Sequence, residues 1–148
     1  MSKTQLLDYR VQLLDRLARQ PVELTETLRT APETFGLLHH VARLRDLEAQ
    51  TFVPGLRRLL TEEHPALELP PPSDDAQPGE PLSQLLDDFV QAREELVTLA
   101  RALPPEGWNR AGFYPPWGAR TVQWWVERVY AQTQECLAEL RRVVTPDT

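Results

Sequence analysis

Apolar side chains recur at alternating steps of three and four residues through the segment that begins at Pro81. They are Leu82, Leu85, Phe89, Ala92, Leu96, Leu99 and Leu103. This spacing places all seven on one face of an α-helix and is typical of a seam between packed helices. Such a seam has to be covered by other helices, so the sequence predicts a helical bundle.

Three further amphipathic segments supply the other helices. The first is predicted to end at Gln20-Pro21, and its inward face is Leu7, Val11, Leu14 and Ala18. The second runs from about residue 33 to about residue 62, with a bend or interruption at Pro54-Gly55. The last begins with Thr121 as its N-cap. Its predicted inward face is Val122, Trp125, Val129, Gln132, Cys136, Leu140 and Val143.

Two irregular stretches separate these helices. A proline-rich loop at about 64–81 joins the second helix to the third, and proline mixed with acidic residues does not hold a regular helix. An aromatic loop, 108–120, precedes the fourth helix, and its large rings are expected to cap one end of the core. We therefore predict an all-α, four-helix bundle that forms one domain over residues 1–148.

The composition narrows the functional class. Hydrophobic residues make up 41% and charged residues 26% of the chain, and no apolar run is long enough for a membrane span. The N-terminus lacks the apolar region of a signal peptide, so a cytoplasmic protein without membrane contact is expected. A net charge of -6 argues against a nucleic-acid partner. The single cysteine excludes an internal disulfide.

Polar residues on the predicted inward faces are the candidate site. His40 and Glu48 lie one turn before and one turn after Leu44 on the second helix, and Gln132 and Cys136 lie one turn apart on the fourth. These four side chains are predicted to converge between two helices, where bundles place their sites. Buried polar groups need partners. Gln132 is therefore expected to hydrogen-bond His40 or Glu48, and Glu48 to pair with Arg43 or Arg128.

The same residues resemble the DinB-like (DinB/YfiT) four-helix bundle family over essentially the whole chain. The similarity lies in 38–48 on the second helix, in Trp108-Asn109-Arg110 and Pro116-Trp117-Gly118 of the aromatic loop, and in 121–140. The resemblance implies a divalent metal, often nickel or zinc, held by one histidine of the second helix and a His-x-x-x-His pair of the fourth. It also implies transfer of low-molecular-weight thiols such as bacillithiol, or isomerisation of maleylpyruvate with mycothiol. A homodimer and a link to stress are further implications.

The sequence departs from the family pattern at the metal ligands. The paired histidines fall on Gln132 and Cys136, and the second-helix ligand falls on His40 or, one turn later, on Arg43. A three-histidine site is therefore impossible, and a neutral amide is a poor ligand for a transition metal. The favoured interpretation is a degenerate metal site without a cofactor, in a stress-related protein with a structural or small-ligand-binding role.

The alternative interpretation is an enzyme. In it His40, Cys136 and Glu48 hold zinc or nickel as a mixed nitrogen, sulfur and oxygen set. The metal would then lower the pKa of a small-molecule thiol or of water, giving a thiol S-transferase or a hydrolase. The sequence leaves open whether the protein is an enzyme.

Overall fold

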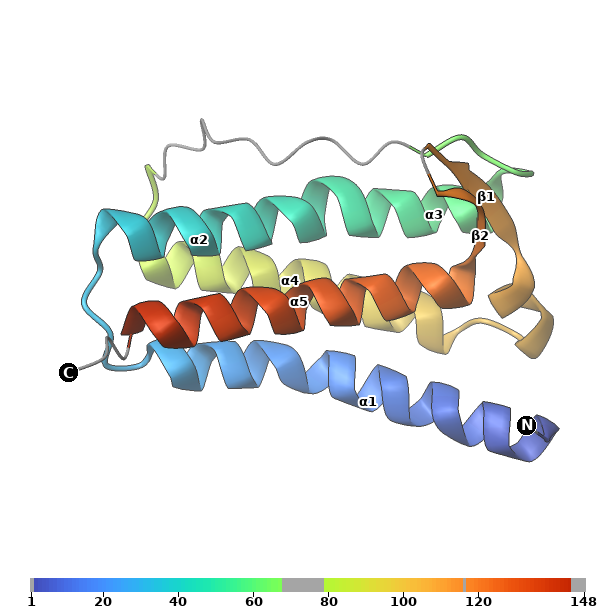
Figure 1. Cartoon of the computed structure of the whole chain (residues 1–148), viewed down its shortest axis with the longest axis horizontal. Helices are drawn as coiled ribbons and strands as arrows, with labels where there is room; N and C mark the ends of the chain where they lie inside the picture. The colour runs from blue at the N-terminus through green and yellow to red at the C-terminus, as the bar shows by residue number, and fades with distance from the viewer. Residues whose placement is uncertain (1, 68–78, 116, 145–148) are drawn as a thin grey trace.

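The computed structural model describes residues 2–67, 79–115 and 117–144 (Figure 1). The elements along the chain are α1 (Lys3–Leu28), α2 (Phe35–Asp46), the π-helical turn η1 (Leu47–Phe52), α3 (Val53–Thr61), α4 (Leu82–Arg101), the 3-10 turn η2 (Pro105–Asn109), β1 (Ala111–Tyr114), β2 (Gly118–Thr121) and α5 (Val122–Val144). The second helix of the bundle is continuous from α2 through η1 to α3. The predicted four-helix bundle is confirmed.

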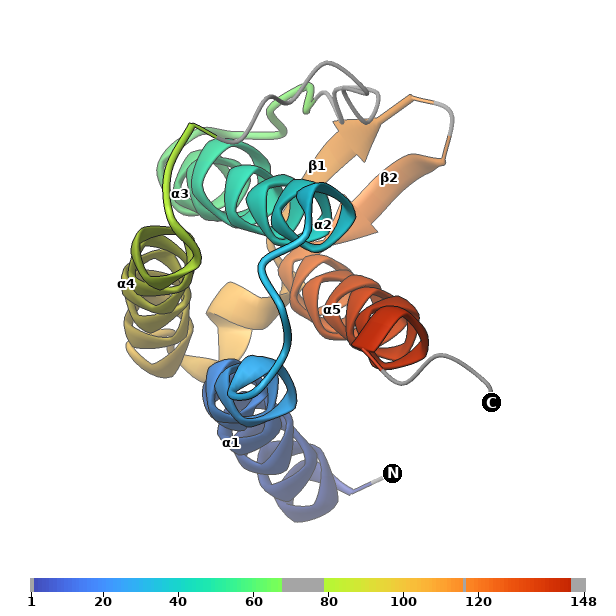
Figure 2. The same cartoon turned by 90° about the vertical axis from the view of Figure 1, so that its left-hand side faces the viewer.

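The helices pack in an order that differs from their order in the chain. Viewed along the bundle, α1 lies opposite α2 and α3, while α4 and α5 fill the two sides between them (Figure 2). In Figure 1, α1 and α5 run in one direction, and α2, α3 and α4 run in the other. Because α3 and α4 are parallel, the chain has to return along the bundle between them. The predicted proline-rich loop at about 64–81 lies between α3 and α4 in the sequence, and its residues 68–78 lie outside the described residues.

The core consists of two apolar clusters with a polar layer between them. One cluster lies at the end of the bundle that carries β1 and β2, which we call the hairpin end, and it includes Leu17, Phe52, Leu96 and Val129. Leu24, Leu44, Phe89 and Leu137 belong to the other. In each helix one buried polar residue separates the two sets, namely Gln20, Glu48, Arg93 and Thr133. The bundle therefore carries a polar cross-section near its middle.

Helix α1 differs from its prediction in both length and orientation. It continues through Pro21 to Leu28, and Leu24 and Leu28 are buried. The predicted stop at Gln20-Pro21 is wrong, because burial of this last part outweighs the helical hydrogen bond that proline removes. The predicted inward face is also wrong except for Leu14. The buried face of α1 is Arg10, Leu13, Leu14, Leu17, Gln20, Pro21, Leu24 and Leu28.

The aromatic loop contains a short hairpin that the all-α prediction did not include. β1 and β2 are antiparallel, with Ala111 opposite Thr121 and Tyr114 opposite Gly118. Gly118 has φ +80°, a conformation that favours glycine. Trp108 and Tyr114 are buried as expected, whereas Phe113 and Trp117 are exposed. The hairpin thus covers the core with alternate side chains only.

Two local predictions, the bend or interruption at Pro54-Gly55 and the N-cap at Thr121, have different outcomes. The chain does not break at Pro54-Gly55, and the helix instead widens into η1 immediately before Val53. The Thr121 hydroxyl accepts a hydrogen bond from the Trp124 backbone N–H at 3.2 Å, so the predicted N-cap of α5 is confirmed. Within the described ranges, no helix is long and apolar enough to cross a bilayer.

Candidate functional site

The polar layer is organised by the guanidinium group of Arg93 on α4, which is 1% exposed. Its Nε and Nη2 atoms donate to the two carboxylate oxygens of Glu48 at 2.7 and 3.0 Å. Nη2 also donates to the Thr133 hydroxyl at 2.7 Å. Nη1 donates to the Gln20 side-chain oxygen at 2.6 Å and to the Leu17 carbonyl at 2.9 Å. These five bonds match the five N–H donors of arginine, so the guanidinium group is fully satisfied.

Pro21 explains why the Leu17 carbonyl is available to Arg93. In an α-helix the carbonyl of residue 17 accepts from the N–H of residue 21, but proline has no N–H. The Arg93 side chain supplies the missing donor. The Arg93 side chain on α4 therefore replaces the hydrogen bond that Pro21 removes from α1.

Gln20 and Thr133 also donate hydrogen bonds to backbone carbonyl groups outside the polar layer. Gln20 donates its side-chain N–H to the Tyr130 carbonyl at 3.1 Å. The Thr133 hydroxyl donates to the Val129 carbonyl at 2.8 Å. Every polar side chain of this layer thus has a fixed orientation, and the arrangement links α1, η1, α4 and α5.

The predicted partners of Glu48 were wrong. Glu48 is 0% exposed and pairs with Arg93 rather than with Arg43 or Arg128. The sequence did carry a signal for this pair: Arg93 lies four residues after Phe89 and three before Leu96, on the apolar seam itself. A buried arginine needs a buried acidic partner, and Glu48 lies at a buried position of the second helix.

Gln132 and Cys136 lie beside the core rather than in it. The buried face of α5 continues from Val129 to Thr133, Leu137 and Leu140, and Gln132 and Cys136 are half-buried. The predicted inward face is therefore wrong at these two positions, and also at Val143, which is exposed. Steps of three and four from Val129 lead to Leu140 through either pair, so the sequence periodicity did not distinguish them.

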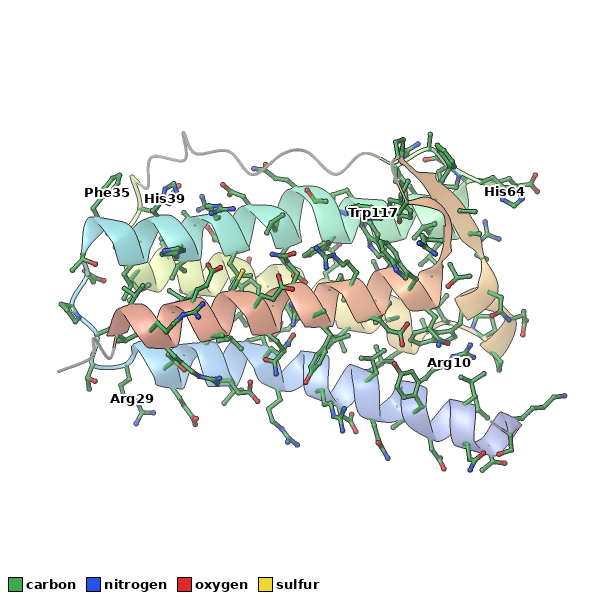
Figure 3. All side chains as sticks on the ribbon, viewed as in Figure 1. Arg10, Arg29, Phe35, His39, His64 and Trp117 are labelled. Carbon is green, nitrogen blue, oxygen red and sulfur yellow. The ribbon has the colours of Figure 1, made fainter. Side chains whose placement is uncertain are left out.

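The side chains around Cys136 form a loose polar strip. The Gln132 amide nitrogen is 4.0 Å from the Cys136 Sγ, and the Gln132 oxygen accepts from Arg128 at 3.1 Å. His40 Nδ1 lies 3.8 Å from a Glu139 carboxylate oxygen. The expected hydrogen bonds from Gln132 to His40 or Glu48 are not among these contacts. His39 stacks on Phe35 at 6.2 Å between ring centroids, at the outer surface of α2 (Figure 3).

The Cys136 thiol lies in surroundings that favour its neutral form. Burial raises the pKa of Cys136, and the hydrogen bond from Gln132 lowers the pKa in part. Glu139 and Glu135 raise the pKa further through their negative charge, while Arg43 lowers it. A thiolate is the form that binds metal or attacks a substrate. The environment of Cys136 therefore does not activate it.

As placed, the candidate donors do not fit a divalent metal. Both carboxylate oxygens of Glu48 accept hydrogen bonds from Arg93, and His40 and Cys136 lie on the strip beside the core. In the part of the chain that the structure describes, no group of three or more His, Cys, Asp or Glu side chains is arranged to hold a metal ion. His40, Glu48, Gln132 and Cys136 therefore do not converge as the sequence suggested.

A separate cavity of about 380 Å3 lies beside η1, near the hairpin end of the bundle. Gln50, Thr51 and Arg58 supply polar atoms to its lining, and Trp125 supplies an aromatic wall. The Trp125 indole N–H donates to the Phe52 carbonyl at 3.0 Å. Its ring stacks on Tyr114 at 4.9 Å. A concave site with one aromatic wall and a few polar groups is suited to a small ligand, and π-helical turns are frequent at functional sites.

Comparison with known proteins finds a matching family model and similar solved structures. The family model described as the DinB superfamily matches residues 37–135. The chain is also similar in structure to YfiT from Bacillus subtilis, described as a probable metal-dependent hydrolase with an unusual four-helix bundle topology. That likeness has a TM-score of 0.80 and 18% sequence identity, and covers 97% of this chain and 89% of YfiT. No curated protein sequence matches the chain significantly.

Proposed function

The chain belongs to the DinB superfamily, and from that premise we propose that it is a member with an altered metal site. In this proposal the protein acts as a structural or small-ligand-binding protein rather than as a metal-dependent enzyme. A stress-related role is part of the proposal and rests on family membership alone. The likeness to YfiT at 18% identity supports the fold and no particular activity.

The observation that carries the proposal is the commitment of Glu48 to Arg93. A buried carboxylate that is bidentate to a guanidinium group is not free to bind a metal or to accept a proton from a substrate. Freeing Glu48 would leave Arg93 as an unpaired buried charge, which is strongly unfavourable. His40 and Cys136 then lack a third ligand. The polar layer instead supports the packing of the bundle.

Metal analysis tests the proposal. Untagged protein is equilibrated with zinc or nickel, exchanged exhaustively into metal-free buffer and measured by inductively coupled plasma mass spectrometry. We expect less than about 0.1 metal ions per chain, for the wild type and for His40→Ala and Cys136→Ala alike. His64→Ala is the matched control, because His64 lies near the hairpin, whereas His39, the sequence neighbour of His40, lies toward the opposite end of the bundle (Figure 3). One metal per chain that is lost in both test variants but kept in the control would refute the proposal.

The enzyme alternative shares this test and adds an activity assay. A metal held by His40 and Cys136 would favour a thiol S-transferase or a hydrolase. Zinc-loaded protein would then consume glutathione, used as a probe thiol, in the presence of an electrophile. We expect the rate to equal that of the uncatalysed reaction and to be unchanged in Cys136→Ala.

For small-ligand binding, the cavity beside η1 is the site that we propose. Its polar groups are those of Gln50, Thr51 and Arg58, and the buried Trp125 ring forms part of its apolar lining. Glutathione and N-acetylcysteine are suitable probes for a small-molecule thiol. Saturable binding measured by calorimetry, weakened at least about tenfold by Thr51→Val and unchanged by Thr98→Val on the surface of α4, would support this site. Binding that is equal in both variants would exclude it.

A further inference from the structure

Arg10 on α1 is a second buried arginine, and its charge is not balanced as the charge of Arg93 is. Arg10 is 5% exposed and Arg93 is 1% exposed. Among the described residues, the arginines that form an ion pair with a carboxylate are Arg45, Arg57, Arg58, Arg93 and Arg101. Burial lowers the pKa of Arg10, and no carboxylate raises it again. A buried charge without a counter-ion is strongly unfavourable, so this position favours an anion.

The hydrogen bonds of Arg10 use little of what its side chain can donate. Nε donates to the Gln123 side-chain oxygen at 2.9 Å, and Nη1 lies 3.4 Å from the Pro105 carbonyl oxygen. The second distance is longer than an ordinary N–H···O bond. The guanidinium carbon lies 5.1 Å from the centre of the Trp108 ring, which supports the cation without supplying a negative charge. Nη2 donates no hydrogen bond to a described residue.

The unused donors lie at the surface. Among the described side chains, the buried polar atoms without a hydrogen-bond partner are the Tyr114 hydroxyl and the Arg120 Nε. Arg10 Nη2 is not one of them, so this atom still contacts solvent, at the hairpin end where Figure 3 places Arg10. The same holds for the side-chain N–H groups of Gln123 and Trp108, which donate to no described residue. A solute can therefore reach donors of all three side chains.

We propose that Arg10, Trp108 and Gln123 form a binding site for a small oxyanion, such as inorganic phosphate or the carboxylate of a small organic acid. We call it the Arg10 site. An oxyanion balances the guanidinium charge and accepts from the unused N–H groups, and arginine binds carboxylate and phosphate particularly well. A neutral ligand would leave the charge unbalanced, and a cation would be repelled. The three side chains come from α1, η2 and α5, so the packing of the bundle holds them together.

The carboxylate nearest to Gln123 along α5 does not serve as the counter-ion. Glu127 lies one turn after Gln123 and accepts a hydrogen bond from the Tyr9 hydroxyl. Glu127 forms no ion pair with Arg10 and is not among the causes that shift the pKa of Arg10. Position 123 is different, because its side-chain oxygen already accepts from Arg10 Nε. A carboxylate placed there would balance the charge from within the chain.

Titration of the untagged full chain with sodium phosphate tests the Arg10 site. The indole N–H signals of the four tryptophans are followed by NMR of nitrogen-15-labelled protein, and Trp108→Phe assigns the signal of Trp108. At constant ionic strength we expect this signal to shift saturably, with a dissociation constant of about 1–10 mM. Sodium acetate is the second probe and represents carboxylates. Sodium chloride should cause no saturable shift.

Gln123→Glu is the decisive variant, because its carboxylate takes over the role of the bound anion. We expect phosphate and acetate to bind at least about tenfold more weakly than to the wild type. In chloride buffer the Tm of this variant should be higher than that of the wild type. Gln12→Glu is the matched control, because it adds the same charge at an exposed position of α1. It should bind the anions as the wild type does.

Three results would overturn the proposal. The first is a wild type whose Trp108 signal shifts saturably with neither phosphate nor acetate. The second is anion binding in Gln123→Glu that equals binding in the wild type. The third is an equal loss of binding in Gln12→Glu, which would reflect the overall charge of the chain. The Arg10 site goes beyond the proposed function and shares no residue with the cavity beside η1 or the strip around Cys136, so these outcomes do not depend on metal or thiol binding.

Discussion

At the scale of single residues, Arg93 determines the character of the bundle interior. A guanidinium group taken out of water is costly unless every donor is used and its charge is balanced. Here Glu48 balances the charge, and Gln20, Thr133 and Leu17 accept the remaining donors. The cost of removing one partner is therefore much larger than the net contribution of the pair.

Arg93→Met is expected to lower the free energy of unfolding by about 3–5 kcal/mol, because Glu48 becomes an unpaired buried charge. Arg93→Met/Glu48→Leu should recover at least half of this loss, since two apolar side chains of similar volume can replace a buried pair. Urea denaturation of the two variants and the wild type measures both values. A loss below about 1 kcal/mol in Arg93→Met would show that Glu48 does not depend on Arg93.

Tyr9 gives a pH-dependent contribution. Burial and the hydrogen bond from its hydroxyl to Glu127 raise the pKa of Tyr9 to about 12, against 10.0 for a free tyrosine. Below pH 10 the phenol is neutral in both the folded and the unfolded chain, so the stabilisation is fully present. Between pH 10 and 12 the unfolded chain releases the proton first, and the stabilisation declines.

The wild type should therefore have a higher Tm than Tyr9→Phe at pH 8, and the difference should shrink as the pH rises from 10 to 12. Thermal unfolding followed by circular dichroism in this range tests the prediction. A Tm difference for Tyr9→Phe that is constant from pH 8 to 12 would contradict the assigned hydrogen bond.

At the scale of elements, α1 is continuous through Pro21 because a side chain of α4 supplies the hydrogen bond that proline removes. Pro21 leaves the Leu17 carbonyl without a helical donor, and Arg93 provides one. We expect Pro21→Ala to be more favourable in an Arg93→Met background than in the wild type, by about 1 kcal/mol, because its new N–H then satisfies a carbonyl that is otherwise unpaired. A double-mutant cycle measured in urea gives this coupling. A coupling of zero would mean that the two residues act independently.

The second helix depends on a glycine where it meets α5. A Cβ on Gly55 would lie 2.3 Å from a ring carbon of Trp125, and Trp125 is held by Phe52 and Tyr114. Gly55→Ala should therefore lower the free energy of unfolding by about 1–3 kcal/mol, although alanine is the better helix former. Gly36→Ala in α2 is the matched control. It meets no atom within 4 Å and should be neutral or stabilising by up to about 1 kcal/mol. Equal effects in the two variants would disprove the tight contact.

At the scale of the whole molecule, the polar layer connects four helices in one cross-section, so the chain is predicted to unfold as a single domain. The four tryptophans lie in the hairpin half, in η2, the hairpin and the first turn of α5, whereas circular dichroism reports on all helices. Tryptophan fluorescence and circular dichroism should give the same midpoint in urea. A fluorescence transition at lower urea would show that the hairpin end unfolds separately.

The sequence by itself determined the helical class, the number of long helices and the family. These follow from local spacing: seven apolar residues in steps of three and four admit one secondary structure, and the N-cap at Thr121 needs only its neighbours. The sequence also showed that no three-histidine site is possible. Such conclusions require residue types and intervals, and no knowledge of which helix packs on which.

The tertiary structure alone decided which face of each helix is buried and which polar groups meet. In α1 and α5 two overlapping stripes satisfy the same periodicity, and only packing selects Leu17 over Val11 and Thr133 over Gln132. The partner of Glu48 is 45 residues away on a parallel helix, a distance that helical periodicity does not encode. The end of α1 was misjudged for the same reason, since the donor that compensates for Pro21 comes from α4. Long-range contacts set the site, because a buried charge is stable only where a distant residue completes it.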